Sequence, residues 1–298
     1  MAAALKTSQS VPQIIWPFLL LATSIWTCFG LSHFATMCGI ALSIYATIKL
    51  HTLMAYRNRS RAAQFERPGT SDVVAWFLLW PGLDARAFFR ASSRDTSVPI
   101  AELAVAFAKI AFGATMFFLV APWFLKVSRL GAGWIALLGV VFMLHFGSFH
   151  LLALWWQSRG RAVRPIMNAP ILATSVSEFW GKRWNLAFRD YASAFLFRPL
   201  ARKWSPVTAL LCGYVFSGIV HEMAISVPAG GGYGLPTLYF ALQGLAMLAE
   251  RRLGLNGGAA GWFWTFSITA PTAFFLFHPP FVNRVVVPLI EVLPASGV

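Results

Sequence analysis

The chain has 298 residues, of which 58% are hydrophobic and 11% are charged, and it carries a formal net charge of +14. A soluble domain has about 25% charged residues, so this chain has too little polar surface to cover a water-soluble fold. The composition, with 13 Trp and 27 Phe, excludes a soluble globule and favours the lipid bilayer as its solvent. Because backbone groups in lipid must be hydrogen-bonded internally, the apolar runs are expected to be helices.

Seven apolar runs are long enough to be membrane helices, since a span needs about 20 mostly apolar residues. They are 14–30, 32–56, 99–125, 133–156, 206–227, 234–250 and 262–280. Two shorter apolar stretches lie at 73–80 and 285–293. The runs predict an all-α, multi-pass integral membrane protein with about seven to nine membrane helices. No repeat or linker divides the chain, so 1–298 is predicted to be one membrane-embedded domain that begins with a helical hairpin at 1–56.

Basic residues are concentrated in alternate connections, as the positive-inside rule requires. Seven arginines lie between 57 and 94 and nine basic residues between 157 and 204, whereas 228–233 has none. The longest connection, 157–205, mixes aromatic and basic residues, which is typical of amphipathic helices in the membrane interface. The positive charge therefore indicates contact with membrane lipids, and nucleic acid is not expected as a partner. The segments predicted to be cytoplasmic are the N-terminus, 57–98, 157–205 and 251–261.

Ionisable residues inside apolar runs are costly and usually face a cavity or one another. Lys49 and Glu250 fall near the ends of predicted spans, where a long side chain can reach the interface. His221 and Glu222 instead lie deep in the otherwise uncharged run 206–227. If that helix starts near 206, His221 is about 22 Å along it, at 1.5 Å per residue. A neutral imidazole at this depth can act as a general base, and a helix-packing histidine is the alternative.

Glu222 points about 100° away from His221 around a helix, so it is expected to be a helper or a structural pair. A metal site is not expected at these residues. The zinc-protease pattern needs a second histidine four residues after the first, and position 225 is Ile.

A second group of residues, Ser-Glu-Phe-Trp-Gly-Lys-Arg-Trp-Asn at 177–185, alternates aromatic side chains with two cations and ends on an amide. One interpretation is an interfacial helix with aromatic anchors and cations that bind lipid headgroups. The other is a ligand site, in which Lys182 and Arg183 meet phosphates and Asn185 gives a hydrogen bond.

The motif Phe-Trp-Gly-Lys-Arg-Trp-Asn at 179–185, followed by Ser-Gly-Ile-Val-His-Glu at 217–222, resembles the membrane-bound O-acyltransferase superfamily. The closer match is its wax synthase branch, which has a similar Phe-Trp-x-x-Arg-Trp-Asn signature and then a histidine in a membrane helix. The resemblance extends over residues 76–285. Shorter similar stretches are Trp80-Pro81-Gly82-Leu83-Asp84, His145-Phe146-Gly147 and Phe277-His278-Pro279-Pro280.

This resemblance implies transfer of a fatty acyl group from acyl-CoA to the hydroxyl of a lipophilic alcohol, with acyl-CoA as a substrate and no separate cofactor. His221 matches the presumed catalytic histidine, and Asn185 matches the motif asparagine, which is expected to stabilise the oxyanion or to position acyl-CoA. The residues expected to bind substrate are Trp180, Lys182, Arg183 and Trp184 of the motif and Gln243 of the next helix. Related sterol and diacylglycerol acyltransferases have a more acidic and aromatic motif than Lys182-Arg183.

Other functions stay open on the sequence. Diacylglycerol, a sterol, a glycan or another metabolite is an alternative acceptor, and a transporter that uses His221 and Lys109 as an ion path is an alternative class. A membrane scaffold without enzymatic activity is a third. The expected location is the inner membrane in a bacterium or the endoplasmic reticulum in a eukaryote, and the oligomeric state is not indicated.

Overall fold

The structure is a computed structural model that describes residues 22, 26, 30–63, 68–92 and 96–293. These residues form helices joined by short connections, and an isolated antiparallel bridge joins Ala91 to Arg161. The all-α membrane class is thus confirmed. The predicted span 14–30 lies almost wholly outside the described residues.

Within the described residues, the number of spans is lower than predicted. Four helices in the described residues are long and apolar enough to cross a membrane, and a fifth is formed if one pair of helices bent by 57° counts as a broken span. The run 234–250 does form a helix, but Glu250, Arg251 and Arg252 gather at its end and make it too polar to qualify. The run 73–80 belongs to a ten-residue helix, which is too short to span. The four spans are His33–Asn58, Ile100–Phe124, Arg129–Ser158 and Pro206–Ala229, and the bent pair is Gly258–Leu276 with Pro279–Glu291.

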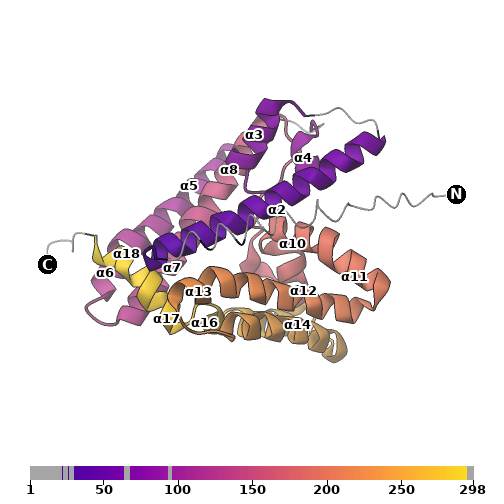
Figure 1. The fold of residues 1–298 in the computed structure, drawn as a ribbon. Helices are drawn as coiled ribbons and strands as arrows, with labels where there is room; N and C mark the ends of the chain where they lie inside the picture. Colours follow the sequence, from indigo (N-terminus) through magenta and orange to yellow (C-terminus); the bar gives the residue numbers. More distant parts are fainter. Residues whose placement is uncertain (1–21, 23–25, 27–29, 64–67, 93–95, 294–298) are drawn as a thin grey trace.

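The N-terminal part of the described chain is one long helix that crosses the molecule diagonally and two short helices that fold back beside its C-terminal half (Figure 1). They are α2 (His33–Ala63), α3 (Thr70–Leu79) and α4 (Ala85–Phe89). The turn between α3 and α4 bends because Trp80-Pro81-Gly82 interrupts the helical hydrogen bonds.

Lys49 fixes this turn to α2. Its side chain is fully buried, and its ammonium donates to the carbonyls of Trp76 (2.8 Å), Trp80 (2.7 Å) and Gly82 (2.7 Å). The ammonium also lies 3.7 Å from the centroid of the Trp76 ring, a cation–π contact. The interpretation that Lys49 reaches the interface was therefore wrong: three carbonyls released by the turn bind the charge inside the protein.

The next unit, 100–158, is a helical hairpin that we call the α5–α8 hairpin. Each arm contains a π-helical turn, and the two arms meet at glycines: a Cβ on Gly113 would lie 2.5 Å from the Gly139 carbonyl oxygen. Such small residues let membrane helices touch backbone to backbone. The first arm is α5 (Ile100–Thr115), η1 (Met116–Val120) and α6 (Ala121–Phe124), and the second is α7 (Arg129–Val140), η2 (Val141–Ser148) and α8 (Phe149–Ser158).

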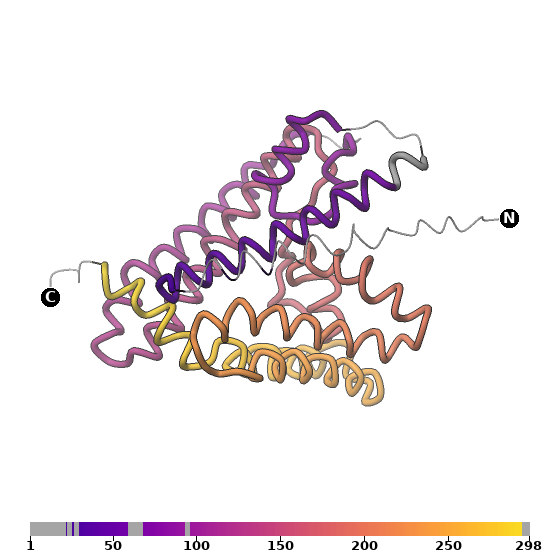
Figure 2. Tube along the Cα trace, in the orientation of Figure 1, coloured from indigo at the N-terminus to yellow at the C-terminus, as the bar shows by residue number. Residues whose placement is uncertain are grey.

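The remaining chain consists of short helices followed by a packed helical pair, which Figure 2 shows as a layer beside α2 and the hairpin. The short helices are η3 (Pro170–Leu172), α9 (Val176–Glu178), η4 (Phe179–Arg183), α10 (Leu186–Ala192), η5 (Ser193–Phe197) and α11 (Arg198–Lys203). The pair is α12 (Pro206–His221), which continues through η6 (Glu222–Ser226) and α13 (Val227–Ala229), and α14 (Leu235–Leu253). The C-terminal elements are α15 (Gly258–Thr269), α16 (Ala273–Leu276), α17 (Pro279–Phe281), η7 (Val282–Val286) and α18 (Val287–Glu291).

Candidate active site

His221 ends α12, and its ring is fixed in one tautomer. Its Nδ1 lies 2.7 Å from the carbonyl oxygen of Ser217, one turn earlier. A carbonyl oxygen can only accept, so Nδ1 carries the proton, and Nε2 of the neutral ring is left with its lone pair. The ring packs against Phe240 of α14, with centroids 4.5 Å apart. His221 therefore presents a basic nitrogen from an apolar setting.

The helix changes geometry directly after His221. Residues Glu222–Ser226 form a π-helical turn, which ends just before Pro228. Proline has no N–H and collides with the carbonyl four residues earlier, so a regular α-helix cannot run through this point. The wider turn changes the direction of the side chains that follow, and such turns are frequent at functional sites.

Gly218 allows α12 and α14 to approach closely one turn before His221. A Cβ at this position would lie 2.6 Å from the Cα of Thr237. Any larger residue would push the two helices apart, and Phe240 would move away from the His221 ring. The close crossing thus sets the surroundings of the histidine.

Glu222 binds the start of α14 and is not directed to a reacting group. Its Oε1 accepts hydrogen bonds from the N–H of Gly234, the N–H of Thr237 and the hydroxyl of Thr237, each 3.0 Å long. These N–H groups would otherwise lack partners at a helix N-terminus. Of the two roles expected for Glu222, the structure shows the structural pair.

Trp180 and Gln243 lie together next to this histidine. The Trp180 indole N–H donates to Oε1 of Gln243 (3.2 Å), and its ring lies 5.5 Å from that of Phe240. Phe240 therefore contacts both Trp180 and His221. The buried Gln243 amide also donates to the Ile268 carbonyl (3.0 Å). Both its oxygen and its nitrogen are thus hydrogen-bonded within the protein, and the role that the structure shows for Gln243 is to hold Trp180 in place.

Asn185 adopts a left-handed conformation, with φ of 40°, and caps α10. Its Oδ1 accepts from the N–H of Phe188 (3.2 Å), and its own N–H points to the sulfur of Met167 (3.2 Å). Asparagine tolerates this conformation and is a good N-cap, so local structure alone explains the residue type. No hydrogen bond within the described residues joins Asn185 to His221.

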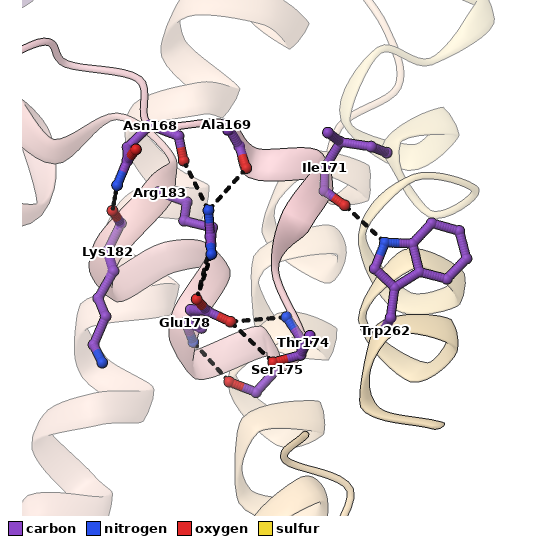
Figure 3. Close-up of polar contacts among 9 residues, drawn as sticks. All are labelled: Asn168, Ala169, Ile171, Thr174, Ser175, Glu178, Lys182, Arg183 and Trp262. Carbon is purple, nitrogen blue, oxygen red and sulfur yellow. Dashed lines mark hydrogen bonds and ion pairs between the residues drawn. The ribbon is translucent and has the colours of Figure 1, made fainter. Parts of the chain in front are cut away.

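Arg183 belongs to a network around Glu178 (Figure 3). Its Nε donates to Oε1 of Glu178 (2.8 Å), and its Nη1 reaches the carbonyls of Asn168 (3.4 Å) and Ala169 (3.2 Å). The second carboxylate oxygen of Glu178 accepts from the N–H (2.8 Å) and hydroxyl (3.1 Å) of Thr174. The Thr174 N–H, with help from Arg183, holds the pKa of Glu178 below its usual value. The Arg183 guanidinium thus holds the motif to the preceding loop.

Lys182 differs from its neighbour, because its side chain is exposed and extends away from this network (Figure 3). Of the two predicted phosphate-binding cations, Arg183 is bound to Glu178, whereas the Lys182 ammonium has no side-chain partner among the described residues. Trp184 packs inward: its ring stacks on Phe179 at 5.5 Å and meets Phe146 of the α5–α8 hairpin edge-on at 6.0 Å.

The motif is bound to α14 by a residue that the sequence had not singled out for this role. Glu250 is buried, and its carboxylate accepts from the N–H groups of Val176 (2.6 Å) and Ser177 (2.9 Å) and from the Ser177 hydroxyl. The interpretation that Glu250 reaches the interface was therefore wrong. The sequence indicates half of this contact, because a short helix after Ser175 exposes N–H groups that need an acceptor, but it does not show that Glu250, more than 70 residues later, supplies it.

A buried Ser226–His278 pair close to this site resembles a nucleophile and its base. His278 Nδ1 accepts from the N–H of Phe281 (3.2 Å), so Nε2 carries the proton and donates to Ser226 Oγ (3.2 Å). A protonated Nε2 cannot remove the hydroxyl proton. The geometry thus disfavours a route in which Ser226 is the nucleophile and His278 its base.

Comparison with known proteins supports the resemblance to the membrane-bound O-acyltransferases. Residues 163–242, which include the motif, His221 and most of the α12–α14 crossing, match the membrane bound O-acyl transferase family. The probable long-chain-alcohol O-fatty-acyltransferase 7 of Arabidopsis thaliana is 30% identical over 143 residues, 42% of each chain. The long-chain-alcohol O-fatty-acyltransferase of Simmondsia chinensis is 35% identical over 72 residues, 22% of this chain and 20% of its own.

The acyl-CoA–sterol O-acyltransferase 1 of Arabidopsis thaliana is 35% identical over 68 residues, 20% of each chain. The matched regions thus cover less than half the length of these relatives. The resemblance to the O-acyltransferase superfamily and its wax synthase-like branch is confirmed.

Proposed function

We propose that this protein is a membrane O-acyltransferase that transfers a fatty acyl group from acyl-CoA to the hydroxyl of a lipophilic alcohol, which yields a wax ester. The observation that carries the proposal is the tautomer of His221, in the region that matches the family: Nδ1 is bound to the Ser217 carbonyl and Nε2 is basic. Long-chain-alcohol acyltransferases among the relatives support the acceptor class.

In the proposed reaction, Nε2 of His221 removes the proton of the alcohol as its oxygen attacks the thioester carbonyl carbon. The resulting tetrahedral oxyanion collapses, the carbon–sulfur bond breaks, and the imidazolium returns the proton to the departing sulfur. A thiol has a pKa of about 8.5, so its thiolate leaves without strong acid assistance. The apolar surroundings keep water away from the thioester.

The motif residues support this reaction in different ways. Lys182 is proposed to attract the phosphates of acyl-CoA, and Arg183 to fix the motif loop. Trp180 and Trp184 would form apolar walls, with Trp180 held in place by Gln243. Asn185 would act through its amide Nδ2, either on the oxyanion or on acyl-CoA.

A sterol is the second candidate acceptor, because one relative is named a sterol acyltransferase. Long-chain alcohols are favoured because several relatives carry that name. Membranes that contain the protein, supplied with labelled palmitoyl-CoA and either hexadecanol or cholesterol, separate the two by the ester that is formed.

The His221→Ala variant tests the base. It is expected to form no labelled ester while it is still inserted and folded, as measured by membrane yield and a monodisperse elution in detergent. Ile219→Ala is the matched control, because it truncates a side chain of the same helix that is 51% exposed, and it is expected to keep most of the activity. Full activity of His221→Ala would show that another group takes the proton.

A further inference from the structure

A large basic cavity lies on the other side of α10 from α12. Its volume is about 970 Å³, and its walls come from the last turns of α2, from α4, from 162–166 and from α10 with η5. The part from α2 and α4 is outside the region that matches the family. Figure 1 shows α4 and α10 at the same end of the molecule as the C-terminal end of α2.

The charge of the cavity is strongly positive. Five arginines and two aspartates line it, and burial raises the pKa of Tyr191 in its wall to about 12, so this phenol adds no negative charge. The arginines are Arg86, Arg90, Arg164, Arg189 and Arg198, and the aspartates are Asp84 and Asp190.

Both aspartates are engaged by the protein. Asp190 holds two guanidiniums, those of Arg164 (2.7 Å) and Arg189 (3.0 Å), while Asp84 accepts the N–H of Ala87 (3.1 Å). Arg189 also has a buried Nε without any acceptor in the described residues. A buried donor without a partner is costly, and a ligand oxygen would satisfy it.

Two aromatic pairs complete the walls. On the α2–α4 side the rings of Tyr56 and Phe89 lie 5.2 Å apart, and on the α10–η5 side those of Tyr191 and Phe195 lie 5.0 Å apart. Aromatic side chains are the usual stacking platforms for nucleobases, and arginines bind phosphates. Aromatic faces beside arginines suit a phosphorylated nucleotide better than a lipid headgroup, which has no base to stack.

The helix that forms one wall of the cavity, α10, packs against the helix that carries the candidate base. Phe188 of α10 stacks on Phe216 of α12, with centroids 6.5 Å apart and ring planes 8° apart. Phe216 is five residues before His221, about 7.5 Å along the helix at 1.5 Å per residue. Leu186, the residue after Asn185, also lines the cavity.

We propose that this cavity binds the phosphorylated adenosine head of acyl-CoA, with Arg90 and Arg198 among its phosphate ligands. The pantetheine arm then carries the thioester past Asn185 and along α10 toward His221. This inference rests on the proposed acyltransferase function, which it makes more specific. In this arrangement the main binding site for the head of acyl-CoA is the cavity, which is built partly from α2 and α4, and Lys182 is an additional cation.

The test is a direct binding measurement. Arg90 and Arg198 are exposed, and their side chains form no hydrogen bond or ion pair with the described residues, so Arg90→Gln and Arg198→Gln are expected to fold normally. Isothermal titration of the full chain in uncharged detergent with CoA is expected to give a Kd about tenfold higher for each variant, since a charged hydrogen bond is lost. Arg202→Gln, on an exposed arginine of α11 outside the cavity, is the matched control and is expected to leave the Kd unchanged.

Truncated probes identify the part of CoA that is bound. Dephospho-CoA is expected to bind more weakly than CoA, and pantetheine without detectable heat. An equal Kd for Arg90→Gln, Arg198→Gln and Arg202→Gln would overturn the proposal. So would displacement of CoA from the wild type by phosphatidylglycerol, equal in strength to displacement by 3′,5′-ADP, since this would identify a site for lipid headgroups.

The same proteins separate this inference from the proposed function. His221→Ala is expected to keep the wild-type Kd for CoA while it forms no ester. Binding of CoA without ester formation by the wild type would refute the acyltransferase and leave the cavity assignment intact. Ester formation by the wild type, together with a Kd for CoA that is unchanged in Arg90→Gln and Arg198→Gln, would refute the cavity assignment and leave the acyltransferase function intact.

Discussion

The α5–α8 hairpin and the motif-bearing segment 163–203 are held in their places by different forces. The hairpin is long, apolar and exposed on its outer face, with Phe107, Phe118 and Trp123 all more than 45% exposed. Its arms fit by shape, since Gly113 and Gly139 let the backbones touch. Few polar side chains are needed, because each long helix satisfies its own backbone.

The motif-bearing segment is made of short helices, and those that begin after a non-helical residue, such as α9 and α10, start with N–H groups that have no partner within the helix. Glutamates supply acceptors for these groups here and at the α12–α14 junction: Glu178 for Thr174, Glu222 for Gly234 and Thr237, and Glu250 for Val176 and Ser177. The chain has only 10 acidic residues, so three glutamates in this role are a large share. Irregular backbone near a membrane is tolerated only when its polar groups are satisfied. The glutamates therefore allow the motif to lie beside α12 and α14, where Phe240 contacts both Trp180 and His221.

The largest effect is expected where a buried carboxylate supports this irregular backbone. Glu250→Gln replaces one carboxylate oxygen by an N–H₂ group that faces N–H donors. It is expected to lower the free energy of unfolding by about 3 kcal/mol, since charge-assisted bonds to buried groups are lost. Titration with SDS in mixed micelles measures the change. Glu102→Gln in the hairpin is the control, with a change below about 1 kcal/mol, because the Glu102 side chain is 53% exposed.

The next effect is on turnover, at the crossing of α12 and α14. Gly218→Ala places a Cβ where the Thr237 Cα lies 2.6 Å away, so α14 and Phe240 must move relative to His221. A displacement of about 1 Å costs on the order of 100-fold in kcat. Gly213→Ala is matched to it, in the same helix with no atom within 4 Å of the added Cβ, and is expected to keep wild-type kcat. Equal rates for both variants would mean that the crossing does not position the base.

The contrast between the two regions also explains what the sequence could predict. Long apolar runs identified α2, the hairpin arms and α12, because a helix in lipid is specified by composition. The spacing of Trp184-Asn185 and His221 identified the candidate site and its class. The roles of Lys49 and Glu250 could not be read, since each depends on carbonyl or N–H groups released by turns far away in the chain. The basic cavity could not be predicted either, because Arg86 and Arg90 are indistinguishable in the sequence from ordinary cytoplasmic loop charges.

The smallest effect concerns Glu178 and depends on pH. The pKa of Glu178 is depressed in the folded protein by the Thr174 N–H and by Arg183. Its contribution to stability is therefore present above the unfolded pKa, about 4.3, and is lost as the pH falls through the folded value. Glu178→Gln is expected to be less stable than the wild type by about 1 kcal/mol at pH 7, and the difference should shrink below about pH 4. Thermal unfolding of both proteins between pH 7 and pH 3 measures this. A difference in stability that stays constant across that range would mean that the charge of Glu178 does not contribute to the stability of the motif loop.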